Sequence, residues 1–154
     1  MISWKQALRE GAVSGSLASL LSGVYLAACG RRRNAMAAPL NAPSHWFFGR
    51  RAIEADEPDL VYTVTGYLVH HAASIFWGVL HAKLWGGRPG AKKPLPAAAG
   101  AIAAASAASF VDLQLAPKRL TPGFEHRLGR PEMVNVYACF ALGLMLGSML
   151  MKRR

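Results

Sequence analysis

The sequence is poor in cysteine and in charge, and each shortage excludes a class of protein. Two cysteines in 154 residues cannot form the disulfide framework of a small secreted domain. Charged residues make up 17% of the chain, against roughly 25% in an average soluble domain. Acidic residues are scarcer still, eight against 18 Lys and Arg, for a net charge of +10. The basic residues lie in the gaps between apolar runs, which indicates the loops of a membrane protein rather than a nucleic-acid partner.

Long apolar runs dominate the chain instead. Hydrophobic residues make up 53% and the mean hydropathy is +0.21. Four runs, at about residues 11–29, 60–85, 95–116 and 133–151, approach the ~20 residues that cross ~30 Å of hydrocarbon as a helix. The third is rich in alanine, and an Ala-rich linker or a soluble helix is its alternative. The sequence predicts an all-α fold, an antiparallel bundle of four transmembrane helices in one integral membrane domain, residues 1–154.

The first run has a second interpretation. Leu26-Ala27-Ala28-Cys29-Gly30 looks like a bacterial lipobox, in which the chain is cut before Cys29 and lipid is attached to its sulfur. The run is longer than the roughly 7–15 apolar residues of a signal peptide, and three arginines that resist export follow it. We therefore expect Met1–Ala28 to stay attached and to form a span.

The two long loops contain recognisable local patterns. Residues 41–51 read as a short interfacial segment, because three adjacent aromatics precede two arginines. Alternatively, Asn41, Ser44 and His45 fold back over the bundle end and complete a site with His126 of the third loop. In that third loop, Thr121 and Pro122 have the pattern of an N-cap and N1 pair that opens a short helix ending near Gly129.

Other charged residues indicate where the second span begins, but they do not indicate how the chain is oriented in the membrane. Asp59 or Asp56 can N-cap the second span, with Glu57 and Pro58 in its first turn. Lys and Arg are tied at nine on each side of the predicted membrane, so the positive-inside rule gives no orientation.

Small residues recur at helical spacing in the first and fourth spans. Gly11, Gly15 and Gly23 lie four or eight residues apart, and Gly143 and Gly147 repeat the spacing. Small residues at this spacing form a groove that lets another helix backbone approach closely. We expect these five glycines to line helix contacts, within the bundle or with another membrane protein or a second copy.

Polar residues form a stripe along the second span, at spacings of four and three: Thr63, Tyr67, His70, Ser74, Trp77 and His81. These residues share one helix face, which should look into the bundle because polar groups facing lipid are unsatisfied. His70 lies near mid-membrane. It is either a proton relay or ligand contact, or a neutral histidine satisfied by a hydroxyl or carbonyl.

Asp112 is the only acidic residue inside a predicted span. Antiparallel topology brings Tyr25, Thr63 and Asn135 to its membrane level, so we predict that Asp112 points inward and bonds some of them. Together with His70 these residues form a candidate intramembrane polar cluster. The cluster is either a clasp that fixes the bundle register or a proton or ligand site.

The sequence predicts no cofactor, metal site or catalytic residue. The first, third and fourth spans contain no histidine, so one chain cannot clamp a haem between spans, although a dimer could. His70 and His71 point to different faces of one helix, which is wrong for convergent metal ligands. Cys29 and Cys139 have no histidine near them in the sequence and suit packing positions.

The order of motifs resembles the YagU-like small inner-membrane proteins of bacteria. The matching pieces are the Gly/Ser-rich first helix, APLNAPSHWFFG in the first loop, YTVTGY in the second span and LTPGFE before the last span. The resemblance implies a multi-pass protein of the bacterial inner membrane without a defined biochemical role. It supplies no catalytic residue.

These observations lead to one expected function and two alternatives. We expect a non-enzymatic accessory or assembly partner that acts through helix packing in the lipid bilayer. The first alternative is a small transporter or channel that uses the polar stripe and Asp112. The second is a membrane enzyme or haem protein that works as a dimer.

Overall fold

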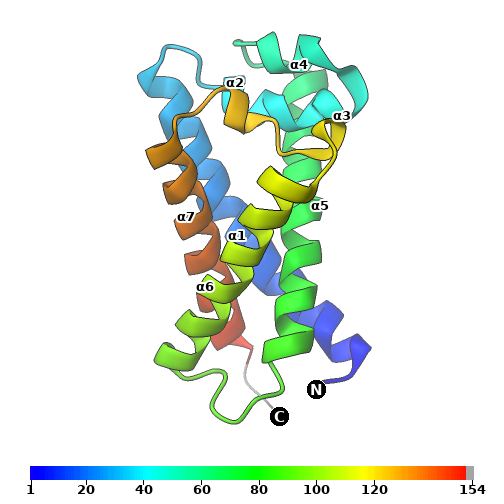
Figure 1. Cartoon of the computed structure of the whole chain (residues 1–154), viewed down its shortest axis with the longest axis vertical. Helices are drawn as coiled ribbons and strands as arrows, with labels where there is room; N and C mark the ends of the chain where they lie inside the picture. Colours follow the sequence, from blue (N-terminus) through cyan, green and yellow to red (C-terminus); the bar gives the residue numbers. More distant parts are fainter. Residues whose placement is uncertain (152–154) are drawn as a thin grey trace. The chain divides into compact units, whose positions relative to one another are not determined.

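The computed structural model describes residues 1–151, and every regular element in that range is helical (Figure 1). The all-α prediction is therefore confirmed. The four long helices are α1 (Trp4–Arg32), α5 (Leu60–Trp85), α6 (Pro94–Phe110) and α7 (Arg130–Leu150). The short elements are α2 (Ala38–Asn41), η1 (Ala42–Ser44), α3 (His45–Phe48), α4 (Arg50–Glu54), η3 (Lys118–Leu120), η4 (Phe124–His126) and η2 (Val111–Leu115), a π-helical extension of α6.

Three helices are long and apolar enough to cross a membrane. They cover Trp4–Arg32, Pro94–Leu115 and Arg130–Leu150, with mean hydropathies of 1.6, 1.5 and 1.8. The alanine-rich third segment is thus a membrane-length helix and not a linker. Helix α5 is also long, 26 residues, but its histidines and hydroxyls lower its mean hydropathy.

Helix boundaries differ from the apolar runs at both ends of the chain. Helix α1 begins at Trp4 and includes Glu10, and α7 begins at Arg130 and includes Glu132. These two glutamates thus lie in membrane-length helices but outside the apolar runs, and the prediction that Asp112 is the only acidic residue inside a span stays a prediction. Hydropathy marks where a helix is apolar, whereas a helix continues through Glu, Arg and Gln because these residues have high helix propensity.

The predicted short helix at Thr121–Gly129 is also wrong. Thr121 is extended, and its hydroxyl donates to the Lys118 carbonyl at 3.2 Å instead of capping a helix. Gly123 has a φ of +87°, a left-handed conformation that stops a helix from forming through it. Only the 3₁₀ turn η4 remains in this segment.

The predicted N-cap of α5 is confirmed at Asp59. Its Oδ1 accepts hydrogen bonds from the amides of Val61 and Tyr62 at 2.7 and 2.8 Å. Glu57 and Pro58 precede the helix, so the prediction that they lie in its first turn is wrong.

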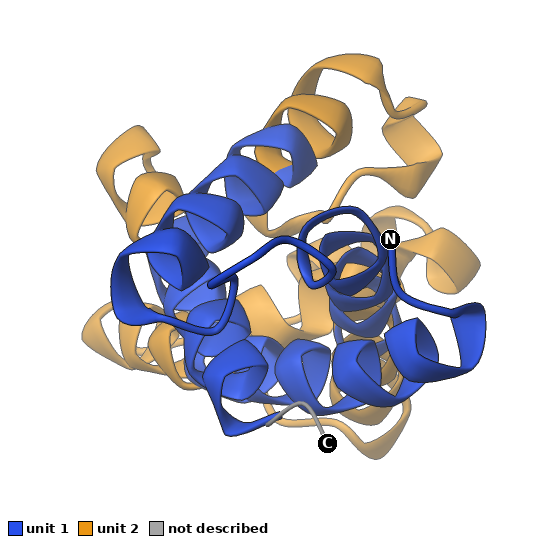
Figure 2. Ribbon diagram, turned by 90° about the horizontal axis from the view of Figure 1, so that it is seen from below, with its two compact units in different colours: residues 1–22, 71–108, 137–154 blue, residues 23–70, 109–136 orange. Residues whose placement is uncertain are grey.

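The described chain divides into two compact units, which are coloured separately in Figure 2. Unit 1 contains residues 1–22, 71–108 and the described part of 137–154; unit 2 contains residues 23–70 and 109–136. Each of the four long helices contributes residues to both units.

Unit 1 is packed through small residues. Its core joins alanines of α1 and α6 to Phe140 and Leu144 of α7. A Cβ atom on Gly15 would lie 2.5 Å from the Ile75 Cα atom of α5, and one on Gly147 would lie 2.9 Å from the Ser14 Cβ atom. Helix α1 therefore approaches both α5 and α7 at nearly backbone contact.

Unit 2 has a different interior. Its fully buried side chains include Pro39, Asn41, Pro43 and Ser44, all from the short helices of the first loop. Phe124 of η4 and Val136 of α7 supply buried apolar groups. Short irregular helices, rather than long ones alone, form this interior.

Candidate functional site: a polar cap in unit 2

Asn41 is the centre of a buried hydrogen-bond network in unit 2. Its amide nitrogen donates to the carbonyls of Ala55 and Glu57, both at 2.9 Å. Its amide oxygen accepts from the Thr63 hydroxyl at 2.6 Å. Both amide hydrogens and the oxygen are thus used, so Asn41 ties α2 to the start of α5.

Ser44 and His45 extend the network along the chain. The Ser44 hydroxyl donates to the Asn41 carbonyl at 2.8 Å. The buried His45 ring lies between two carbonyl oxygens, with Nδ1 2.9 Å from that of Ala42 and Nε2 3.4 Å from that of Lys118. We call Asn41, Ser44, His45 and Thr63 the polar cap. The alternative in which Asn41, Ser44 and His45 fold back matches the structure to the extent that all three lie in this network.

The first and third loops are held together around the polar cap. A Cβ atom on Gly123 would lie 2.6 Å from the Ala42 carbonyl oxygen and 2.7 Å from His45 Nδ1, so only glycine fits there. The Trp46 indole donates to the Thr121 carbonyl at 2.9 Å, and Arg119 Nε donates to the Trp46 carbonyl at 3.2 Å. The APLNAPSHW and LTPGFE segments thus meet within one unit.

His126 takes no part in the hydrogen bonds of the polar cap. Its side chain is exposed, and its Nε2 lies 3.6 Å from Oε1 of Glu125. Phe124, two residues earlier, supplies the buried side chain of η4 and contacts His70 edge-on, with the ring centroids 6.2 Å apart. The proposed loop site of Asn41, His45 and His126 is therefore assembled at Asn41 and His45.

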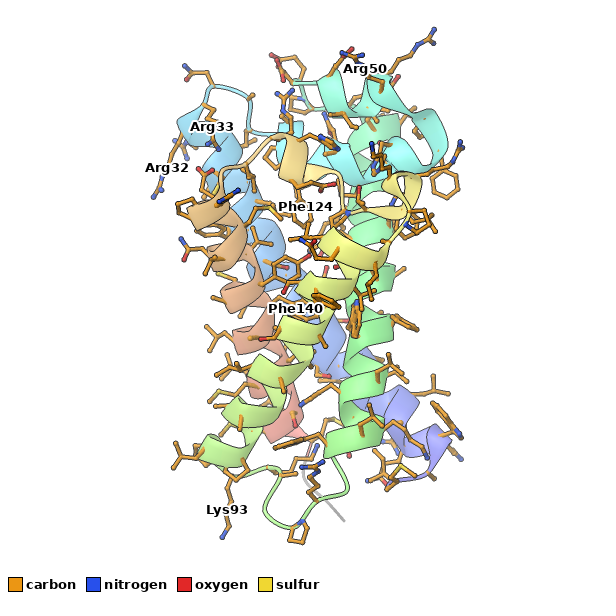
Figure 3. All side chains as sticks on the ribbon, viewed as in Figure 1. Arg32, Arg33, Arg50, Lys93, Phe124 and Phe140 are labelled. Atoms are coloured by element: carbon orange, nitrogen blue, oxygen red, sulfur yellow. The ribbon has the colours of Figure 1, made fainter. Side chains whose placement is uncertain are left out.

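Basic and aromatic residues are exposed on the surface of unit 2. Arg32, Arg33 and Arg50 project from one end of the unit (Figure 3). Phe47 is 64% exposed and Phe48 is partly exposed. An exposed pair of aromatics followed by arginines is the composition expected of a segment in the headgroup layer, and the predicted interfacial position stays a prediction.

Ion pairs fasten the loops of unit 2 to each other. Arg33 donates to Glu132 at 2.7 Å, and this hydrogen bond raises the pKa of the Arg33 guanidinium. Arg127 pairs with Asp56 and also donates to the Ile53 carbonyl at 3.1 Å. These contacts connect the end of α1 to the start of α7, and the third loop to the end of the first loop.

The candidate intramembrane cluster divides into separate contacts. Asn135 donates to the Tyr25 hydroxyl at 2.9 Å, whereas Thr63 bonds to Asn41 in the polar cap. Asp112 is half-buried in η2, and its predicted inward bonds to these residues stay a prediction. Of the predicted cluster, Tyr25 and Asn135 thus form a pair, and Thr63 belongs to the polar cap.

Unit 1 contains a charged group that sequence reasoning missed. The Lys92 ammonium pairs with the Glu10 carboxylate, and Gln6 donates to the other carboxylate oxygen at 3.1 Å. Glu10 lies just before the first apolar run and Lys92 lies in a Gly/Pro turn, so hydropathy alone does not indicate that either is buried. The signal that could have revealed them is that Ala7, Glu10 and Gly11 share one face of a continuing helix.

Among residues 1–151, no group of three or more His, Cys, Asp or Glu side chains could hold a metal ion. Comparisons with known protein families, curated proteins and solved structures find no match for this chain. The function is therefore argued from the geometry alone.

Proposed function

We propose that the chain is a multi-pass protein of the bacterial inner membrane whose four long helices form an antiparallel transmembrane bundle. The observation that carries this proposal is the distribution of side chains on α5. The large exposed side chains of α5 are mostly apolar: Leu60, Val61, Val64, Leu68, Phe76 and Leu84. All six residues of its polar stripe are buried or half-buried. A helix with apolar residues outside and polar residues inside suits a lipid environment.

Topology mapping tests the membrane arrangement. Single cysteines at Arg50 and Arg88, in a background with Cys29→Ser and Cys139→Ala, report the loop between α1 and α5 and the loop between α5 and α6. We expect a membrane-impermeant maleimide to reach the two positions from opposite sides of sealed vesicles. Labelling of both from one side, or release of the chain by alkaline carbonate, contradicts the proposal.

Within the membrane we propose a non-enzymatic accessory role. The polar groups of the cap are used by the chain's own backbone, which suits a structural element better than a reaction centre. The glycines of unit 1 contact the chain's own helices, so a partner protein would use the exposed apolar side chains, such as Val24 and Leu68. Affinity purification after crosslinking in intact membranes tests the role. We expect one larger membrane complex to be enriched, and recovery of the chain alone contradicts it.

A transporter or channel is the second candidate, and the polar stripe of α5 favours it. Ser74 and His81 of this stripe are buried in unit 1. Solute or proton flux into liposomes that depends on His70, His81 or Asp112 would support this candidate over the accessory role. A Soret absorption band in the purified protein would instead support the dimeric haem protein.

A further inference from the structure

The Glu10–Lys92 ion pair is buried in unit 1 and joins three elements. The side chains of Glu10 and Lys92 are 5% and 18% exposed. The Lys92 ammonium also donates to the Ser148 hydroxyl of α7 at 3.3 Å. The pair thus connects α1, the loop at residues 86–93 and α7. Removing two charges from water is costly, so burial of this pair is not by itself explained by a gain in stability.

His81 is a second buried polar group in the same unit. It is 4% exposed, and within residues 1–151 neither of its ring nitrogens has a hydrogen-bond partner. A neutral imidazole has one donor and one acceptor, and both lose the hydrogen bonds that water would give. An unpartnered buried histidine therefore needs an explanation beyond packing.

His81 lies on the face of α5 that contacts α1. Gly78 of α5 packs against the Gly11 carbonyl, where an added Cβ would lie 2.6 Å away. Ala82 packs against Ala7 in a small apolar cluster. Because residues three and four apart share a helix face, His81 lies on the same face of α5 as Gly78 and Ala82. It is therefore directed to the side of α1 that carries Ala7 and Gly11.

Glu10 lies on the matching face of α1, between Ala7 and Gly11 in the helical register. A Cβ atom on Gly86 would lie 3.2 Å from Oε2 of Glu10 and 2.6 Å from the Ala82 carbonyl oxygen, so the carboxylate lies beside the last turn of α5. A buried carboxylate–ammonium pair and a buried imidazole thus lie at the same contact between α1 and the last turns of α5.

The other charged groups around this site are basic. Glu10 is the only acidic residue in the sequence of unit 1. On α5, Lys83 donates to the Ile2 carbonyl, and in the following loop Arg88 lies over the Trp85 ring. Lys5 and Arg9 of α1 are exposed, and the described part of α7 in unit 1 has no Lys, Arg, Asp or Glu. Glu10 is therefore the only carboxylate side chain of unit 1 with which Lys92 or a protonated His81 can pair.

We propose that Glu10, His81 and Lys92 form a proton-binding site, in which a proton taken up by His81 competes with Lys92 for the Glu10 carboxylate. The proton comes from water and binds a free ring nitrogen, and the imidazolium then donates to Glu10. Two cations beside one carboxylate repel each other. The Lys92 side chain is 18% exposed, against 5% for Glu10, so the Lys92 ammonium is the group of the pair that can turn toward water.

Two isosteric substitutions give the site opposite signatures. Glu10→Gln removes the attractive charge and leaves Lys92, so His81 should bind a proton about tenfold more weakly. Lys92→Met removes the repulsive charge and leaves Glu10, so His81 should bind a proton about tenfold more tightly. The double variant is uncharged at both positions and should lie between the single variants.

NMR of the full chain with ¹³C-labelled histidine rings, in detergent micelles, measures these effects between about pH 9 and about pH 3, a range that brackets the ordinary imidazole titration. Comparison with His81→Gln assigns the His81 signal, and His126 in unit 2 serves as the control that should not respond. Opposite shifts of the His81 titration midpoint support the site. Equal midpoints in all variants, shifts of one sign, or a His81 ring that does not titrate in the wild-type chain overturn it. The wild-type titration needs no variant to fold.

Discussion

The two units of this chain are stabilised in different ways. Unit 1 is packed through glycine and alanine, where helix backbones approach each other directly. Unit 2 is held by side chains that bond to backbone carbonyls, with Asn41 alone reaching two carbonyls and one hydroxyl. Close packing tolerates no added volume, whereas a hydrogen-bond network tolerates no lost partner. Substitutions that add volume and substitutions that remove a partner should therefore affect the two units differently.

The largest effect is expected where volume is added in unit 1. In Gly143→Leu the new side chain would begin 2.7 Å from the Leu17 carbonyl carbon of α1. Overpacking costs about 1–3 kcal/mol and occasionally more, and we expect the upper end because backbone rather than a flexible side chain stands in the way. Thermal unfolding in detergent measures it. Leu146→Ala, on an exposed position of the same helix, is the control and should change stability by less than about 1 kcal/mol. Equal small effects would mean that α7 does not contact α1 at this face.

Loss of a partner in unit 2 is expected to have the next largest effect. Asn41→Ala removes three hydrogen bonds and leaves the carbonyls of Ala55 and Glu57 without their donor. A buried polar group without a partner costs about 1–3 kcal/mol. Water at the loop can hydrogen-bond some of these groups, so we expect the free energy of unfolding to fall by about 2–3 kcal/mol in total. Chemical unfolding monitored by tryptophan fluorescence checks this. Gln114→Ala removes an exposed amide of the same unit and should leave the free energy of unfolding nearly unchanged. A comparable loss of stability in Gln114→Ala would show that the hydrogen bonds of Asn41 are not what stabilises unit 2.

The difference between the units also explains what the sequence could predict. The spacing of Gly11, Gly15, Gly143 and Gly147 identifies close-packing positions because helical periodicity is a local property. It does not identify the partner helix, and Gly78 of α5, which meets Gly11 and Gly15, was not singled out. The pairing of one helix with another depends on loop geometry, which a single stripe does not contain.

Unit 2 was harder to predict because backbone atoms do most of the accepting. Sequence reasoning named Asn41, Ser44 and His45 but paired them with His126, since it could compare only side chains with side chains. Their partners are the backbone carbonyls of Asn41, Ala42, Ala55, Glu57 and Lys118, and the residue type does not indicate which backbone carbonyl is available. The Glu10–Lys92 pair was missed for a related reason, because hydropathy treats a charge at a helix end as solvent-exposed.

A single hydrogen bond between the loops of unit 2 should have an intermediate effect. Trp46→Phe keeps an aromatic ring but removes the indole donor to the Thr121 carbonyl. A typical hydrogen bond contributes about 0.5–1.5 kcal/mol, and we expect a loss in that range together with faster amide exchange in residues 118–121. Hydrogen exchange followed by mass spectrometry measures the local change. Trp77→Phe in unit 1 is the matched control and should leave exchange at residues 118–121 unchanged.

The smallest effect is expected at the surface ion pair of Arg33 and Glu132. Arg33 is exposed, and exposed pairs contribute about 0–1 kcal/mol because water and salt screen them. Arg33→Met should therefore cost less than about 1 kcal/mol at low salt and close to nothing at about 1 M salt, where the Debye length is about 3 Å. The guanidinium stays charged because its raised pKa lies far above neutrality. The salt dependence thus reports screening and not titration of Arg33. Arg51→Met, on an exposed arginine of α4, is the control and should show a weaker salt dependence. An Arg33→Met loss that persists at high salt would show that this contact organises unit 2 as strongly as the polar cap does.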